Sequence, residues 1–297
     1  MDWNKDKKLD IISGCYWTDD ADAAGHIQIL TGEGGMEFAK AKPLLNENDK
    51  PLENVVLKNG AEDEEMTSNI CTQQHAVDYD ADGDLDLVVG CFGSKFFLYE
   101  NLANNNDGEN TLAATPTTLP LTFPGYHSAP HLCDWDNDGD LDLLSGGADG
   151  GVFYSENTGT RSKPKWSEFK QLVAKPDAKS NQQRIGASSL AKATRVWTID
   201  ANGDGQLDLL VGDSVSVVSP GDGVDEKEFE QKFAELEKRS AELNAKMVAL
   251  QPTPDAKPDP TEMSELTSAM MELYEERTKY IKTESAGHVW LLIRKTK

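Results

Sequence analysis

The chain has 297 residues, which is long enough for one large all-β domain or for two domains of ordinary size. Its 52 acidic residues outnumber its 29 basic residues, and the net charge of −23 argues against nucleic acid and anionic membranes as partners. No apolar run approaches the roughly 18 residues of a membrane-spanning helix, so we expect no nucleic-acid binding and no membrane insertion.

An aspartate-rich loop begins at the second residue and recurs three times along the chain. The copies read DWNKDKKLDIISG from Asp2, DYDADGDLDLVVG from Asp78, DWDNDGDLDLLSG from Asp134 and DANGDGQLDLLVG from Asp200. Their starts are separated by 76, 56 and 66 residues. Repetition on this scale is typical of an architecture that stacks one supersecondary unit several times, in a ring or in a line.

Each loop carries oxygen-bearing side chains at its positions 1, 3, 5 and 9. Position 6 is glycine in three copies, which permits a positive φ, and position 7 can offer its backbone carbonyl. Calcium accepts about 6 to 8 oxygen ligands, whereas magnesium needs a tighter octahedral shell and retains its waters. Without a cation the carboxylates would repel one another. We therefore predict a calcium ion in each of the three regular loops.

The first copy departs from this pattern. Lys7 replaces the glycine and Lys8 occupies position 7, which adds positive charge and strains the backbone. Calcium binding by this loop therefore remains open. Its ligands would be Asp2, Asn4, Asp6, Lys8 and Asp10.

The segments around the loops argue against an EF-hand, which needs a bidentate glutamate at position 12 and flanking helices. Position 12 is Val89, Ser145 or Val211 in the regular copies. The loops instead run into short apolar segments that end in glycine, and strand-like segments precede them, namely QQHAV, APHLC and TRVWTI. Each loop is thus expected to join two strands of a β-sheet.

Two further strands are expected in each repeat. The third strands are predicted in GHIQILTGE, KFFLYEN and GGVFYSEN, and the less hydrophobic fourth strands in EFAKAKPLL, TLPLTFP and PKWSEFKQLV. No strand precedes the first loop, so either the start is truncated or the first sheet is completed from elsewhere.

The four cysteines show no CxxC spacing, which argues against a zinc knuckle and a thioredoxin-like site. Free core thiols and one disulfide both remain open for Cys15, Cys71, Cys91 and Cys133.

From about Asp225 the composition changes to glutamate, lysine, alanine and leucine. Apolar residues follow a heptad pattern from Phe229 to Leu250, which predicts a coiled-coil-like helix. A second helix follows the proline-rich QPTPDAKPDP, with Thr261 as its expected N-cap. Since GHVWLLIRK then resembles GHIQILTGE, we expect an antiparallel helical hairpin inserted between the second and third strands of one repeat. The predicted ranges are 1–224 for the β-repeats, 225–283 for the hairpin and 284–297 for the returning strand.

The loop pattern, its position between strands and its spacing resemble the FG-GAP/VCBS repeat family, which is related to the integrin α-chain β-propeller. The resemblance implies an all-β propeller of about four such blades, in a complete, incomplete or partner-completed ring, with the helical hairpin as an insertion. It also implies three sets of calcium ligands: Asp78, Asp80, Asp82, Asp84 (carbonyl) and Asp86; Asp134, Asp136, Asp138, Asp140 (carbonyl) and Asp142; and Asp200, Asn202, Asp204, Gln206 (carbonyl) and Asp208.

The function implied by the resemblance is non-enzymatic: a calcium-binding module for binding, adhesion or scaffolding. It would be secreted or at the cell surface, where calcium is near millimolar, although no leader is present in this chain. The alternative is a carbohydrate-binding protein or a polysaccharide lyase, because similar calcium-bearing propellers occur in such proteins. The ligand would be a protein or a glycan, and the hairpin would be either a solvated decoration or an arm for a partner or for self-association.

Three residues are candidates for ligand binding in a central channel. His75 and His131 each lie three residues before the first aspartate of their loop, and Trp197 has the matching place in the last repeat. A hydrogen-bonded structural role is the alternative for the histidines. No GxSxG, HExxH or phosphate-binding glycine loop is present, and the aspartates fit metal coordination better than acid–base catalysis. We therefore expect no catalytic residues.

Overall fold

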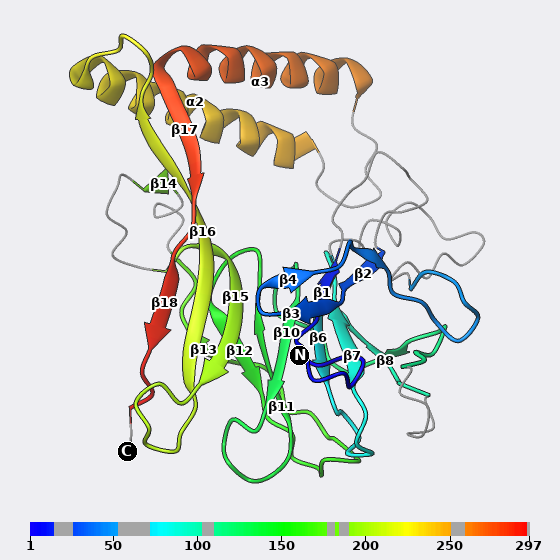
Figure 1. The fold of residues 1–297 in the computed structure, drawn as a ribbon. Coiled ribbons are helices and arrows are strands. Elements are labelled where there is room, and N and C mark those ends of the chain that lie inside the picture. The colour runs from blue at the N-terminus through cyan, green and yellow to red at the C-terminus, as the bar shows by residue number, and fades with distance from the viewer. Residues whose placement is uncertain are drawn as a thin grey trace. The chain divides into compact units, whose positions relative to one another are not determined.

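The computed structural model describes residues 1–14, 26–52, 72–102, 110–176, 182–183, 190–250 and 259–295. This part of the chain is mostly β, with antiparallel sheets and two long helices (Figure 1). Contacts divide the chain into two compact units. The first comprises Met1–Ala178, Ser189–Ser214 and Gly287–Lys297, and the second comprises Lys179–Ser188 and Val215–Ala286.

The first unit contains four sheets in chain order, which we call modules 1 to 4. Module 1 consists of β1 (Ile11–Gly14), β2 (Ile27–Leu30) and β5 (Lys42–Pro43), with the short hairpin of β3 (Gly32–Gly34) and β4 (Glu37–Phe38). Module 2 consists of β6 (Gln73–Val77), β7 (Asp86–Gly90), β8 (Phe96–Tyr99) and β9 (Thr117–Thr118). Module 3 consists of β10 (Ala129–Cys133), β11 (Asp142–Gly146), β12 (Val152–Ser155) and β13 (Lys170–Val173). Module 4 consists of β15 (Lys192–Ile199), the first part of β16 (Asp208–Pro220) and β18 (Val289–Leu292).

The strands predicted on either side of the regular loops are present. QQHAV forms β6 and APHLC forms β10, and each pairs antiparallel with the strand after its loop. The register aligns Val77 with Asp86 and Cys133 with Asp142, so each loop connects the first two strands of its sheet. Strands rather than helices flank the loops, which excludes the EF-hand. Closure of the modules into a ring remains a prediction.

The second strand of each inner module is buried on both faces, because consecutive modules pack against each other. Leu87 and Val89 of β7 pack with module 1, whereas Val88 packs with module 3. A third apolar cluster joins modules 3 and 4, with Leu144 of β11 and Val211 of β16 among its members. Two-sided burial explains why these strands are continuous apolar runs, since each buried aliphatic side chain contributes about 1.5–3 kcal/mol.

The structure describes two of the four cysteines, and it decides between a free thiol and a disulfide for these two. Cys91 and Cys133 are free thiols within this β-rich unit, the first buried and the second half-buried. Cys15 and Cys71 lie outside the described residues.

Position 13, counted from the first aspartate of the loop, is glycine in every module, and in three modules this glycine allows the next module to approach closely. A Cβ atom placed on Gly14, Gly90 or Gly146 would lie 2.0 to 2.2 Å from the nearest backbone carbonyl oxygen of the following module. Those carbonyls belong to Thr72, Ser128 and Thr194, each six residues before the next loop. Such a distance is far below van der Waals contact, so only glycine fits.

We predict that Gly146→Ala lowers the free energy of unfolding by about 1–3 kcal/mol, because the new methyl group would overlap the carbonyl of Thr194. Gly212→Ala is the matched control, since its Cβ would meet only the Arg195 carbonyl oxygen at 4.0 Å. Urea unfolding measures both variants. Equal losses would mean that strand propensity, and not the contact between modules, requires glycine.

The helices are inserted between the second and third strands of module 4. β16 continues past module 4, and its residues Val215 to Pro220 pair with β17 (Ile281–Ala286) in a two-stranded ribbon, which the short β14 (Gln182–Gln183) joins in parallel. β18 then returns to pair with residues Leu209 to Gly212 of β16. The longer segment of the second unit, Val215–Ala286, therefore includes a ribbon that lies mostly outside the predicted range 225–283.

The second unit contains α2 (Glu226–Leu250) and α3 (Pro260–Tyr280), which form a helical hairpin (Figure 1). Phe229, Leu236, Leu273 and Ile281 form its buried cluster, and ion pairs join the helices, including one between Arg239 and Glu276 at 2.5 Å. The predicted N-cap is wrong: Asp259 caps α3, because its carboxylate accepts the N–H groups of residues 261 and 262 while Pro260 occupies the first turn.

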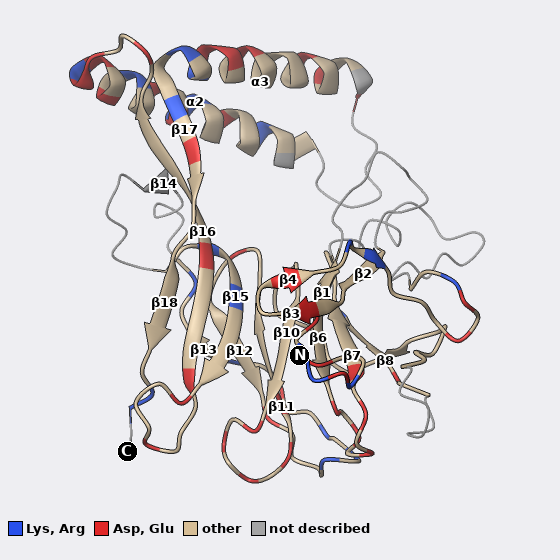
Figure 2. Cartoon of the chain, in the orientation of Figure 1, with Lys and Arg blue, Asp and Glu red and all other residues tan. Residues whose placement is uncertain are grey.

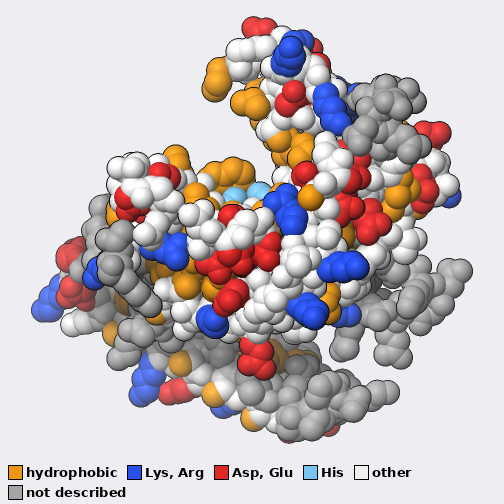
Figure 3. Space-filling model, turned by 90° about the horizontal axis from the view of Figure 1, so that it is seen from below, with side chains coloured by type: hydrophobic (Ala, Val, Ile, Leu, Met, Phe, Trp, Pro, Cys, Tyr) orange, Lys and Arg blue, Asp and Glu red, His pale blue; other side chains and the backbone are white. Residues whose placement is uncertain are grey.

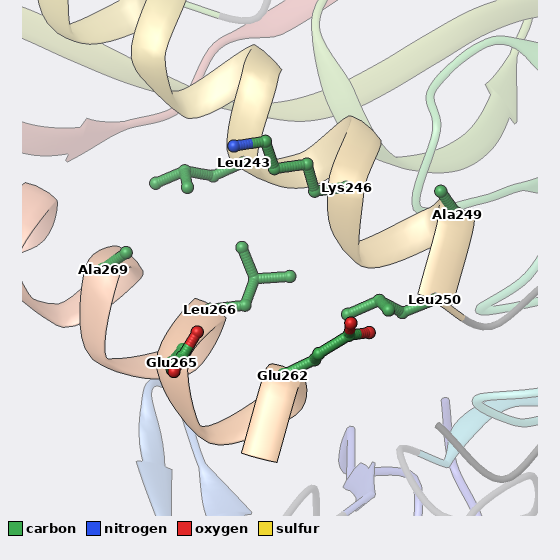
Figure 4. Close-up of a pocket in the computed structure, with 8 residues that line it drawn as sticks. All are labelled: Leu243, Lys246, Ala249, Leu250, Glu262, Glu265, Leu266 and Ala269. Atoms are coloured by element: carbon green, nitrogen blue, oxygen red, sulfur yellow. The ribbon is translucent and has the colours of Figure 1, made fainter. Parts of the chain in front are cut away.

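The two helices separate toward the ends that face the proline-rich segment. A groove of about 420 Å³ opens there between Leu243, Leu250 and Ala249 of α2 and Leu266 and Ala269 of α3 (Figure 4). Lys246, Glu262 and Glu265 also line it. Neither of these helices is long and apolar enough to cross a membrane, nor is any other helix in the described ranges.

Candidate metal centre

The aspartate at loop position 9 ties the loop to its sheet in all four modules. One carboxylate oxygen accepts the N–H of loop position 2 at 2.8 to 3.1 Å. The other accepts, at 2.7 to 2.8 Å, the N–H of the residue two places beyond the third strand, which is β2, β8, β12 or β18 in modules 1 to 4. Both oxygens of each carboxylate therefore bind backbone donors, and all four side chains are buried. These residues are Asp10, Asp86, Asp142 and Asp208.

The loops share one internal hydrogen-bond pattern. In each, the N–H of position 7 donates to the side-chain oxygen of position 5 at 2.9 to 3.0 Å. Position 6 adopts a positive φ, at 96° for Gly83, 97° for Gly139 and 84° for Gly205. The turn thus brings positions 1, 3 and 5 to one side, as the glycine in the sequence pattern predicts.

Two of the loops bring three carboxylates together. Oxygen atoms of Asp78, Asp80 and Asp82 lie within 4.8 Å of one another, and so do those of Asp134, Asp136 and Asp138. Figure 2 shows the acidic residues of these loops gathered at one end of the strands. Hard oxygen donors at this spacing are the ligand type that calcium and similar cations require.

Buried carboxylate oxygens that have no hydrogen-bond partner indicate whether these residues fit a cation. Within the described residues, Oδ1 of Asp78, both carboxylate oxygens of Asp84 and Oδ1 of Asp140 are buried and accept no hydrogen bond. Leaving a buried carboxylate unpaired is unfavourable, and a bound cation would remove that cost. The residues present therefore fit a calcium ion.

The side chain at position 7 is a feature that the sequence analysis missed. Asp84 and Asp140 were predicted as carbonyl ligands only, yet both side chains are buried in their loops. Position 7 is Gln206 in the last loop and Lys8 in the first, so the regular motif did not indicate a carboxylate there. Asp84 and Asp140 can offer carboxylate oxygens as well as carbonyls.

The electrostatics of the loops favour proton or cation binding. Burial, together with the neighbouring carboxylates of Asp82 and Asp86, raises the pKa of Asp84 to about 7. Burial likewise raises the pKa of Asp86 and Asp142 to about 6, against the backbone hydrogen bonds that they accept. A cation would therefore compete with protons for these carboxyl groups as the pH falls toward their pKa values, and at higher pH it would offset their negative charge.

The first and last loops differ from the two central ones. Lys7 adopts the positive φ of the glycines, at 68°, and the ammonium group of Lys8 lies 3.8 Å from the Asp6 carboxylate. The Lys8 ammonium group thus neutralises part of the negative charge of the first loop. In the last loop, Asn202 donates to Asp204 at 3.1 Å, so its amide is hydrogen-bonded inside the turn. The calcium assignments of these two loops remain predictions.

The three channel candidates come together. The ring of His131 lies 4.6 Å from that of His75 and 4.5 Å from that of Trp197, measured between centroids. They stand on β6, β10 and β15, the first strands of three consecutive modules. Figure 3 shows histidine side chains among hydrophobic ones on the face drawn there. Binding of a ligand by this trio stays a prediction.

Both histidines of the trio are neutral at pH 7. Burial lowers the pKa of His75 to about 4, and burial together with the nearby His75 lowers the pKa of His131 to about 3. His131 Nε2 lies 2.8 Å from the hydroxyl of Thr198, while its Nδ1 is buried without a hydrogen-bond partner among the described residues.

Asp213 organises the end of module 4, and the sequence analysis did not single it out. Its carboxylate accepts the backbone N–H groups of Ala191 and His288 at 2.8 and 3.0 Å, and the indole N–H of Trp290 at 2.7 Å. These hydrogen bonds lower its pKa in spite of burial. The Nδ1 atom of His288 lies 3.2 Å from the same carboxylate.

Fold and loops together define a protein built from repeated β-modules, each with an acidic loop between its first two strands. The model of the FG-GAP-like repeat matches residues 78–145 and 134–211, which include the three regular loops. Residues 78–211 therefore consist of FG-GAP-like repeats, which supports the assignment to the FG-GAP/VCBS repeat family.

Comparisons with individual proteins add little to this assignment. No curated protein matches the chain. Among solved structures, a chain of the Photorhabdus luminescens Tc holotoxin pore is 16% identical over 64% of this chain, with a TM-score of 0.34. The match spans 7% of that chain's length, and a TM-score of this size supports no argument about fold or function.

We predict that Asp84→Asn stabilises the metal-free protein near pH 8 and reduces the stabilisation that calcium provides. The amide removes a buried charge that has no partner, and it also removes a potential ligand. Asp49→Asn, in an exposed turn of module 1, removes the same charge as a control. Thermal unfolding with and without calcium measures both. An Asp84→Asn protein that gains as much from calcium as Asp49→Asn does would contradict a role for Asp84.

We also predict that calcium raises the melting temperature more at about pH 8 than at about pH 5. The raised pKa values of Asp84, Asp86 and Asp142 mean that the metal-free folded state binds more protons than the unfolded state between about pH 4 and pH 7. Metal-free stability from these groups therefore falls as the pH rises through that window, and calcium offsets the loss. Dialysed, metal-free protein scanned at both pH values provides the measurement, and an equal calcium effect would refute it.

Proposed function

We propose that this chain is a non-enzymatic, calcium-stabilised binding module that works outside the cell or at the cell surface. The observation that carries the proposal is the set of buried carboxylate oxygens without partners in the loops of modules 2 and 3. Position 7 carries such an oxygen in both loops, on Asp84 and Asp140, and this repetition supports a shared ligand over an accident of one turn.

Three calcium sites are proposed, in the loops that begin at Asp78, Asp134 and Asp200, with the first loop as a weaker fourth. When bound, each ion supplies positive charge that neutralises the carboxylates at positions 1, 3 and 5. The chain's own contribution is the position-9 aspartate, which holds the loop against the third strand with two backbone hydrogen bonds. Binding to the folded state alone would stabilise the modules by mass action.

A role in catalysis, including that of a lyase, is less well supported. A general base works best with a pKa near the operating pH, whereas the buried His75 and His131 have pKa values of about 4 and 3. The acidic groups with raised pKa values lie in the loops, where metal binding accounts for them.

The partner is proposed to be a protein or a glycan. The net charge of −23 disfavours nucleic acid and anionic lipid surfaces. Within the second unit, the groove between α2 and α3 combines apolar side chains with Lys246, Glu262 and Glu265 (Figure 4), which suits the helical hairpin to contacts with a partner.

Calcium titration by calorimetry tests the proposal, because affinity reflects the compartment. Extracellular modules bind calcium with dissociation constants of about 10⁻⁴ to 10⁻³ M, and cytosolic sensors bind it roughly 100-fold more tightly. We expect three ions per chain in the weaker range. Absence of binding would overturn the metal assignment, and submicromolar affinity would overturn the extracellular one.

A further inference from the structure

Consecutive modules always pack in the same sense, with the back face of one against the front face of the next. The back face of a module is formed by loop position 11 and by the first and third residues of its third strand (β2, β8, β12 or β18). The front face is formed by loop positions 8 and 10. Interior back faces carry Phe96 and Leu98 of module 2 and Val152 and Tyr154 of module 3, which are only 0 to 7% exposed. Three interfaces within the chain follow this rule.

The back face of module 4 has the same apolar character, but no other module in the described part of the chain packs against it. Val289 and Leu291, which occupy the equivalent positions on β18, are 77% and 50% exposed. Trp197 is 56% exposed, whereas His131 at the same place in module 3 is 4% exposed because Trp197 lies against it. Gly212 likewise has no carbonyl from a following module against it.

One position of this face differs in chemistry from its equivalents. Just beyond the third strand, one residue donates its backbone N–H to the position-9 aspartate. The residue before this donor is Glu100 in module 2 and Glu156 in module 3, but Ile293 in module 4. Ile293 is exposed and extends the apolar surface of Val289 and Leu291. Contiguous exposed apolar surface of this kind marks an interaction site.

The front face of module 1 is exposed in the same way. Ile11 is 43% exposed, while its equivalents Leu87, Leu143 and Leu209 are 0 to 6% exposed. Leu9 is 69% exposed, while Leu141 at the same loop position is 8% exposed. Within the described residues, the back face of module 4 and the front face of module 1 are both exposed, and neither face buries the other.

We propose that the back face of module 4 binds the front face of module 1 of a second copy of this chain. A second copy presents the kind of face that every interior back face contacts, so the association would continue the packing already established between modules 1 and 4. The contact is heterologous, since the two surfaces differ, and it therefore closes into a finite assembly or extends as an open one. Because each copy carries a charge of −23, higher salt should strengthen the association.

Sedimentation of the full chain over a range of concentrations tests the proposal. Leu291→Asp on the back face and Ile11→Asp on the front face should each weaken self-association by about tenfold or more, because a charge would have to be buried. Met36→Asp is the matched control, since Met36 is 91% exposed at the turn between β3 and β4 and is not one of the residues that define either face. Circular dichroism verifies folding, and Leu291→Gln and Ile11→Thr replace any variant that fails to fold.

Mixing the two face variants gives the sharper result. A heterologous contact predicts that Leu291→Asp and Ile11→Asp proteins associate with each other, because the pair retains one intact front face and one intact back face, and that assembly stops at two copies. A wild-type chain that stays monomeric at all concentrations would overturn the proposal. So would association that survives both variants, or that is lost instead with Met271→Asp on the exposed side of α3.

Discussion

Burial of the second strand on both of its faces is the constraint on which the rest of this structure depends. It requires continuous apolar runs such as Leu87 to Val89, with alternate side chains contacting the preceding and the following module. It also requires glycine at the end of the strand, where the next module's carbonyl approaches too closely for a Cβ atom. In the described residues, the front face of module 1 and the back face of module 4 keep the same apolar character but are exposed. Exposure of these apolar side chains therefore points to association.

The acidic loops follow from the same arrangement. A loop between two buried strands must satisfy its backbone donors at the edge of the sheet, and the position-9 carboxylate accepts one from the loop and one from beyond the third strand. This places a charge at the edge of the core, and the remaining aspartates crowd around it. Burial and mutual repulsion then raise the pKa values of Asp84 and Asp86, so that a divalent cation would be a better partner than protons at neutral pH.

The helical hairpin is accommodated because it leaves and re-enters module 4 between paired strands. β16 remains paired with β18 on the module side and with β17 beyond it, so the backbone hydrogen bonds of the strand are satisfied along its length. The hairpin has its own buried cluster around Leu236 and Leu273, and it does not depend on the β-modules for that core.

The sequence by itself determined the local elements: the loops, the strands QQHAV and APHLC, and the existence and order of two helices. These depend on spacing and on the character of neighbouring residues, which a sequence displays directly. Only the tertiary structure decided that the Asp84 carboxylate is buried, that Asp213 holds His288 and Trp290, and that the faces of modules 1 and 4 are uncovered. The N-cap of α3 is Asp259 and not Thr261. Both residues carry an oxygen-bearing side chain next to Pro260, and only the backbone conformation decides which of them caps the helix. Burial and pairing join residues that are distant in the chain, and no local pattern records which of them meet.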